Sequence, residues 1–298
     1  MGIAEVIPGV SGGTIAFITG IYEKLIDSIK AVGPELIRGY KTAGIKGAWN
    51  AINGGFLAAL GAGMIIGLLS GVMGITYLIE HYPPAIWAFF FGLIVSSAIY
   101  IFRQISSFKA MEFIAIAVGF GIAYYVTIAT PAHGSESLLM VFISGAIAIS
   151  AMILPGVSGS FILLLMGMYM IVLPAVEKAV KHFDPAAIKT VLVFISGCIV
   201  GLAIFSRVIS WVFKHHKNVA LALLTGFMIG SLNKLWPWRN VIQTRINSKG
   251  EEVPFLENNV LPAAYEGNPM VITAVITLIA GLAVVFVLDY FGKKEEVV

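Results

Sequence analysis

One heptapeptide occurs twice in this chain, and each copy interrupts a long apolar stretch. Residues 7–13 read Ile-Pro-Gly-Val-Ser-Gly-Gly, and residues 154–160 read Leu-Pro-Gly-Val-Ser-Gly-Ser. A proline followed by glycines ends the preceding helix and frees backbone groups that hydrocarbon cannot satisfy. Each copy is followed at the same spacing by a glycine and a tyrosine, namely Gly20 and Tyr22, and Gly167 and Tyr169. Duplicated breaks of this kind are typical of the binding sites of transporters with internal repeats.

The composition places these breaks in a membrane protein. Of the 298 residues, 58% are hydrophobic and 12% are charged, whereas a soluble domain carries about a quarter charged residues. Apolar runs extend through the whole length, so we expect a single membrane domain over residues 1–298. The net charge of +3 gives no reason to expect a nucleic-acid partner. A single cysteine, Cys198, excludes an intramolecular disulfide and a cysteine-cluster metal site.

Segment lengths predict both spanning and re-entrant helices. A spanning helix needs about 20 apolar residues, and six runs qualify: Gly54–Glu80, Ala85–Phe102, Met111–Thr130, Ile188–Phe213, Val219–Leu235 and Met270–Asp289. Ser137–Leu173 is apolar too, but one helix of that length would measure roughly 55 Å against a hydrocarbon core of about 30 Å. Its motif divides it into halves of about 14–17 residues, which are short for spanning. We therefore expect a re-entrant helix hairpin with the motif at its tip.

The first copy predicts a similar hairpin whose outgoing half runs from Thr14 to about Ile29. Few residues precede its motif and no cleavable signal peptide is visible, so we expect the native chain to begin upstream of Met1. Gly63 and Gly67 match Gly197 and Gly201, which extends the repeat into the helices that follow. We assign the internal repeats to about residues 1–131 and 136–291.

Helix counting gives the orientation of the repeats. Three spans separate the hairpins, and an odd number inverts the second half relative to the first. The predicted fold is an all-α polytopic membrane protein, an inverted repeat of a re-entrant helix hairpin plus three transmembrane helices. Lysine and arginine are more numerous on the side of the Glu23–Asn53 loop, which makes that side cytoplasmic. On the outer side we expect Trp236–Pro269 to be an irregular loop, with Trp236-Pro-Trp238 as an interfacial anchor.

The motif chemistry suits an anion. Consecutive backbone N–H groups that open a helix form an anion-binding nest, and nearby hydroxyls add donors. Two nests from inverted hairpins would face each other near the midplane, where they suit a phosphate or carboxylate headgroup. The phosphate-binding residues predicted on this basis are Gly9, Ser11, Gly12, Gly13, Thr14, Gly156, Ser158, Gly159 and Ser160. The alternative is that each motif only kinks and packs two helices.

Four charged residues in or beside apolar runs complete the predicted site. Arg207 suits bidentate phosphate binding, although it could instead snorkel to the cytoplasmic surface. Glu5 could carry a coupling proton or hold a cation, or could lie at the membrane surface. Lys24 and Arg103 are further candidates for charge partners. No HExxH, Walker or Ser/His/Asp constellation occurs, so we expect neither an enzyme, a cofactor nor a metal site.

Four stretches of the sequence resemble a prokaryotic polyprenyl-phosphate (undecaprenyl phosphate) transporter family, formerly a domain of unknown function. These stretches are Met1–Thr14, Gly20–Leu25, Leu154–Ser160 and Gly230–Trp238. The resemblance implies a flippase in a bacterial or archaeal cytoplasmic membrane that returns undecaprenyl phosphate to the cytoplasmic leaflet for cell wall biogenesis and other envelope polymer synthesis. The partners expected are this lipid and the bilayer, with coupling to a proton or sodium gradient left open. The alternative is a secondary transporter or channel for a small soluble anion.

Overall fold

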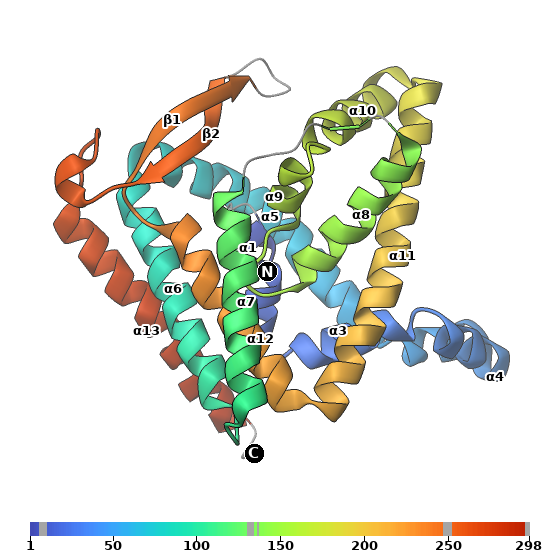
Figure 1. Ribbon diagram of the computed structural model, residues 1–298. Coiled ribbons are helices and arrows are strands. Elements are labelled where there is room, and N and C mark those ends of the chain that lie inside the picture. The colour runs from blue at the N-terminus through green and yellow to red at the C-terminus, as the bar shows by residue number, and fades with distance from the viewer. Residues whose placement is uncertain (6–10, 130–133, 136, 247–251, 296–298) are drawn as a thin grey trace.

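The computed structural model describes residues 1–5, 11–129, 134–135, 137–246 and 252–295 (Figure 1). Most of the described residues are helical. The helices are α1 Gly2–Glu5, α2 Gly12–Ile18, α3 Tyr22–Ala31, α4 Pro34–Ala51, α5 Gly54–His81, α6 Pro83–Arg103, α7 Ala110–Ile128, α8 Leu138–Ile153, α9 Gly159–Leu165, α10 Tyr169–His182, α11 Pro185–His215, α12 Lys217–Ser231 and α13 Val271–Glu295. Two short 3-10 turns, η1 Leu232–Leu235 and η2 Pro262–Ala264, and two strands, β1 Arg239–Ile246 and β2 Glu252–Asn259, complete the chain.

Each of the six apolar runs predicted to span a membrane corresponds to helical structure, namely α5, α6, α7, α11, α12 with η1, and α13, although Thr130 at the end of the third run lies outside the described residues. Among the described residues, five helical segments are long and apolar enough to cross a bilayer: Pro34–Gly71, Pro83–Arg103, Ala110–Ile128, Pro185–His215 and Lys217–Leu235. The bent pair α9–α10 would form a sixth crossing if it served as one span. The chain is therefore an all-α polytopic membrane protein that carries one small sheet.

Close helix pairs build the body of the molecule, with α7 against α12, α6 against α13, and α8 against α11. Glycines permit this contact, since a Cβ at Gly226 of α12 would collide with the Ile116 carbonyl oxygen of α7. In the same way, a Cβ at Gly92 of α6 would collide with the Leu278 carbonyl oxygen of α13. Small residues of this kind let helix backbones approach where lipid leaves little hydrophobic driving force. The two glycines thus give the α6–α13 and α7–α12 pairs the same kind of close backbone contact.

The helices that come after the two motifs are shorter than predicted. α2 and α9 have seven residues each, whereas the sequence predicted half-helices of about 14–17 residues, the first of them reaching about Ile29. The cause is a left-handed glycine, Gly20 at φ +71° and Gly167 at φ +69°. A residue in this conformation ends a helix. The chain then turns by 113° between α9 and α10.

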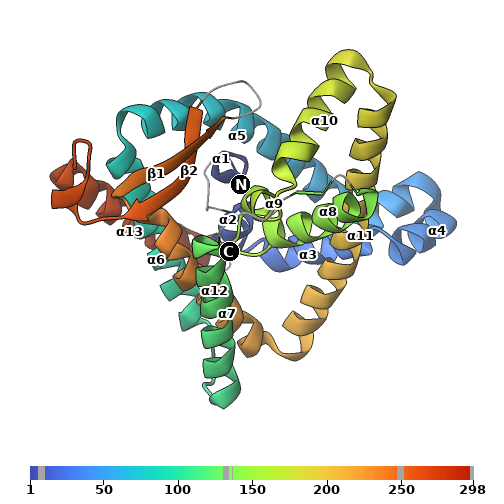
Figure 2. The ribbon, with the colours of Figure 1, turned by 45° about the horizontal axis from the view of Figure 1, so that its top comes forward.

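α9 folds back along α8. A Cβ at Gly159 would collide with the Ala148 carbonyl oxygen, and Leu163 packs with Val141 and Ala148. α8, the motif turn and α9 therefore form a helical hairpin. In Figure 1, α8 and α9 extend from the end of the molecule that carries β1 and β2 toward its middle. The turn between them lies at a height between the upper and lower ends of α7. Figure 2 shows α1, α2 and α9 at the centre, between α7 and α12 on one side and α8 and α11 on the other.

The segment Trp236–Pro269 is not the irregular loop that was predicted. It contains an antiparallel pair in which Arg239 lies opposite Asn259. β1 contains the β-branched residues Val, Ile, Thr and Ile, and such residues favour strands. Trp236 and Trp238 fasten this hairpin, because their indole Nε1 atoms donate to the carbonyl oxygens of Val260 and Pro269, each at 2.8 Å.

Candidate functional site

The two copies of the motif touch each other at the centre of the molecule. Ser11 Oγ donates to the Met152 carbonyl oxygen at 2.8 Å, and Gly156 N donates to Thr14 Oγ1 at 3.1 Å. A Cβ at Gly13 would collide with the Ile153 carbonyl oxygen. The fold thus brings together two segments that lie far apart in the sequence.

The described part of the first copy, which begins at Ser11, is closed. Ser11 is 1% exposed, and Gly12, Gly13 and Thr14 are also buried. Gly12 N donates to Glu5 Oε1 at 2.8 Å, while Gly13 N donates to Ser11 Oγ at 3.0 Å. The Glu5 carboxylate therefore occupies the position at the start of α2 where a bound anion was predicted. Gly9, another predicted ligand, lies outside the described residues.

The second copy opens into a cavity of about 470 Å³. Ser158 and Ser160 line it, and their hydroxyl oxygens lie 3.0 Å apart. Ser158 Oγ also accepts a hydrogen bond from Phe161 N at 3.4 Å. Gly156 has φ +80°, a backbone conformation that only glycine adopts easily. Gly159 is buried against α8, so the serines are the side chains of this motif that reach the cavity.

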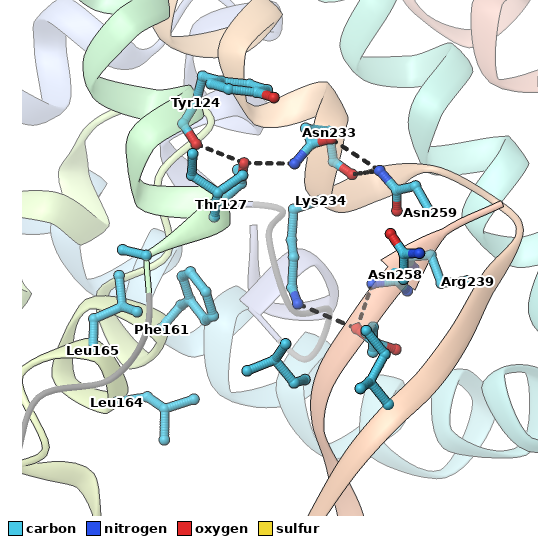
Figure 3. A pocket seen from close by; sticks show the side chains of 15 residues that line it. Tyr124, Thr127, Phe161, Leu164, Leu165, Asn233, Lys234, Arg239, Asn258 and Asn259 are labelled. Carbon is cyan, nitrogen blue, oxygen red and sulfur yellow. Dashed lines mark hydrogen bonds and ion pairs between the residues drawn. The ribbon is translucent and has the colours of Figure 1, made fainter.

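Two cations and one carboxylate line the same cavity. Glu257 Oε2 lies 3.2 Å from Lys234 Nζ and 2.9 Å from Arg239 Nη1 (Figure 3). The side chains are 22% exposed for Lys234, 7% for Arg239 and 19% for Glu257. Burial lowers the pKa of the Arg239 guanidinium, and Glu257 acts in the opposite direction. Arginine stays protonated at any physiological pH, so this cluster carries one net positive charge.

Aromatic rings support both cations. The Arg239 guanidinium lies over the Trp87 ring, 4.0 Å from its centroid, and Lys234 Nζ lies 5.2 Å from the centroid of Phe161. Cation–π contacts of this kind contribute about 0.5–2 kcal/mol of attraction each, in addition to the ion pairs with Glu257.

A second cavity of about 350 Å³ adjoins the first and shares Lys234, Arg239 and Glu257 with it. Its wall contains a chain of amide contacts, drawn in Figure 3. Asn233 Nδ2 donates to Thr127 Oγ1 at 2.8 Å, and Asn259 Nδ2 donates to Asn233 Oδ1 at 2.9 Å. These bonds connect α7, η1 and β2, and so fix the strand that carries Glu257.

The other predicted charged residues lie elsewhere. Arg207 Nη1 donates to the Ala203 carbonyl oxygen at 2.6 Å, and its guanidinium lies beside Gly33. Lys24 Nζ lies 4.9 Å from the ring centroid of Phe56, and Arg103 lies 5.9 Å from that of Phe286. Within the described residues, neither cavity is lined by these three side chains. Among the described residues, no group of three or more His, Cys, Asp or Glu side chains could hold a metal ion.

Sequence reasoning missed Lys234, Arg239 and Glu257 as site residues. A signal was present, because Lys234 lies within the Gly230–Trp238 stretch on which the family resemblance rests. Arg239 directly follows that stretch, and only the fold of β1 and β2 brings Glu257 to both cations.

A polytopic helical membrane protein with a duplicated helix-breaking motif in its sequence and a cation-lined cavity has the features of a membrane transport protein. Residues 1–253 match a family model described as undecaprenyl phosphate translocase-like. A polyprenyl-phosphate transporter of Vibrio cholerae is 43% identical over 298 residues, which cover 99% of this chain and 94% of that protein. A polyprenyl-phosphate transporter of Staphylococcus aureus is 32% identical over 250 residues, or 80% and 83% of the two chains.

This chain therefore belongs to the undecaprenyl phosphate translocase-like family. No solved structure matches it.

Proposed function

We propose that this chain translocates undecaprenyl phosphate across the cytoplasmic membrane, and that the phosphate binds in the cavity at the second motif. The observation that carries this proposal is the meeting of Lys234, Arg239, Ser158 and Ser160 around one cavity. A phosphate that leaves water loses many kcal/mol of hydration unless charged and polar groups replace it. Two cations and two hydroxyls supply such groups, and a single carboxylate leaves the cluster positive.

The apolar side of the cavity favours a lipid over a small soluble anion. Ile79, Pro83, Trp87 and Leu164 line it beside the charged cluster. The first isoprene unit next to the phosphate would contact these residues, while the rest of the chain stays in the bilayer. Many large apolar side chains on α5, α7, α11 and α13 are exposed and suit contact with lipid.

The two halves, about residues 1–131 and 136–291, are proposed to form an inverted repeat that alternates access. The open second motif and the closed first motif then correspond to a state open to the outer leaflet. The headgroup would move inward when the protein closes around Ser158 and opens around Ser11, Gly12, Gly13 and Thr14. Glu5 would leave the start of α2 in that step, and Arg207, Lys24 and Arg103 become candidate contacts on the inner side.

Flipping of a fluorescent polyprenyl phosphate in proteoliposomes tests the proposal. Loss of one charge-assisted hydrogen bond should lower the rate about tenfold or more in Lys234→Gln and Arg239→Gln. Lys189→Gln is the control, because Lys189 is exposed near the start of α11 and lies in neither cavity. Gel filtration checks that each variant is folded. Wild-type flipping in both substituted variants would refute the site, and uptake of labelled inorganic phosphate without lipid flipping would favour the soluble-anion alternative.

A further inference from the structure

We propose that Glu257 is a built-in competitor that keeps the phosphodiester lipids of the surrounding bilayer out of the cavity, so that a phosphate monoester alone displaces it. The inference rests on the proposed function, since it assumes that a lipid phosphate binds at Lys234 and Arg239. It assigns Glu257 a role in specificity that is distinct from binding itself.

The first argument is the position of the carboxylate. A single oxygen of Glu257 lies within 3.2 Å of Lys234 Nζ and 2.9 Å of Arg239 Nη1. That oxygen therefore occupies the space where an oxygen of a bound phosphate would contact both cations. An anion in this position must either replace Glu257 or lie next to its negative charge.

The second argument is that the cations can keep their positions when Glu257 leaves. Trp87 supports the Arg239 guanidinium and Phe161 supports the Lys234 ammonium, and both rings belong to the helical body. Arg239 and Glu257 belong to the paired strands β1 and β2, and the contact between Asn259 and Asn233 holds this sheet in place. Displacement moves only the glutamate side chain and leaves the cations arranged for a new anion.

The third argument is charge. A phosphate monoester carries about two negative charges at neutral pH and has three terminal oxygens. It attracts the two cations more strongly than the single charge of Glu257 does, so exchange favours it. A phosphodiester carries one negative charge, and its exchange with a carboxylate gains little. Because Glu257 is tethered beside the cations, it competes at an effective concentration of about millimolar or higher.

This competition matters because phosphodiester lipids greatly outnumber a carrier lipid in a membrane. Without Glu257, the described lining of the cavity would carry two positive charges and no negative one, and an abundant anionic phospholipid would occupy it. Removal of the carboxylate should therefore leave the monoester able to bind but make its binding sensitive to the anionic phospholipid around the protein.

The test compares two vesicle compositions. Wild type and Glu257→Gln are reconstituted in phosphatidylcholine alone, and in phosphatidylcholine with phosphatidylglycerol, and the flipping of a fluorescent polyprenyl phosphate is measured in both. Phosphatidylglycerol should change the wild-type rate by less than about twofold but lower the rate of Glu257→Gln about fivefold or more, because it fills the vacated site. Glu266→Gln is the matched control, since Glu266 is exposed and lies outside both cavities.

Each outcome of this test either supports or contradicts the role proposed for Glu257. If phosphatidylglycerol inhibits wild type as strongly as Glu257→Gln, or inhibits neither, the competitor role is wrong. A wild type that flips no polyprenyl phosphate in either vesicle refutes the proposed function instead. If Glu257→Gln does not fold, Glu257→Ala is tested in its place. Strong inhibition of the wild type by phosphatidylglycerol would overturn the inference by itself, whichever variant is used.

Discussion

Ser11 and Ser158 occupy the same place in the two copies of the motif, yet their surroundings differ. Ser11 is buried, donates to the Met152 carbonyl oxygen and accepts from Gly13 N. Ser158 is half-buried and lines the large cavity. Position 5 holds glutamate where position 152 holds methionine at the aligned place, and the Glu5 carboxylate helps to close the first copy. Residues at the same place in the motif thus serve packing in the first copy and line the cavity in the second.

Alanine at these two serines should separate stability from binding. Ser11→Ala removes a buried donor and a helix cap, so it should lower the free energy of unfolding by about 1–3 kcal/mol. Ser158→Ala removes a longer cap bond, from Phe161 N at 3.4 Å, and no bond to the first copy of the motif, so it should lower the free energy of unfolding by only about 0.5–1 kcal/mol, yet slow the flipping of polyprenyl phosphate. Thermal denaturation in detergent and flipping in proteoliposomes measure the two effects. Equal destabilisation by both substitutions would contradict the asymmetry.

At the scale of elements, the same cap ends α2 and α9. Ile21 N donates to the Ala16 carbonyl oxygen and Gly20 N to that of Phe17. Around Gly167 the equivalent bonds run from Met168 N to Leu163 and from Gly167 N to Leu164. This is the Schellman arrangement, which requires a left-handed residue after the helix. It fixes the length of both short helices and the direction in which α3 and α10 leave the centre.

Gly20→Ala tests this cap, because no atom lies within 4 Å of the place where its Cβ would stand. The cost then comes from the backbone alone, and we expect a loss of about 1–2 kcal/mol in the free energy of unfolding. Gly61→Ala is the matched control, since Gly61 has equally open surroundings within the helical backbone of α5. Alanine there should stabilise the helix by up to about 1 kcal/mol. Thermal denaturation of both variants gives the comparison, and a stabilised Gly20→Ala would contradict the assigned cap.

The sequence predicted helices and turns correctly wherever they depend on the residues of one segment alone. Apolar length predicted α5, α6, α7, α11, α12 and α13, and the Pro-Gly pair predicted the turn between α8 and α9. The early ends of α2 and α9 were missed because the left-handed conformation of a glycine depends on where the fold directs the next helix. The pairing of Lys234 and Arg239 with Glu257 was missed for a similar reason, since strand register brings these residues together.

At the scale of the whole molecule, polar contacts close the end opposite the β hairpin. Asp27 of α3 accepts from Ser210 Oγ of α11 at 2.7 Å and lies 3.6 Å from Lys214 Nζ. Glu23 pairs with Lys217 at 2.8 Å. The ion-paired side chains are about half exposed, so each pair contributes only about 0–1 kcal/mol. Such contacts are weak enough to break during a transport cycle.

The tyrosines that follow the two motifs differ in the same way as the two serines. The Tyr22 hydroxyl is buried and has no hydrogen-bond partner among the described residues, whereas Tyr169 lines the open cavity beside Ser158. A buried hydroxyl without a partner costs about 1–3 kcal/mol. Separation of α3 from α11 would let water or a phosphate reach the Tyr22 hydroxyl, and the cost of burying this hydroxyl would then be relieved.

Locking α3 to α11 should therefore stop translocation without stopping binding. Asp27→Cys and Ser210→Cys are combined with Cys198→Ala, which removes the native thiol, and a short thiol cross-linker joins the pair. The cross-linked protein should bind a fluorescent polyprenyl phosphate from the outer side as before, but flipping should cease and return when a cleavable linker is cut. The single-cysteine variants control for the loss of Asp27 and Ser210 contacts. Undiminished flipping by fully cross-linked protein would mean that α3 and α11 need not separate, and that the headgroup takes another route inward.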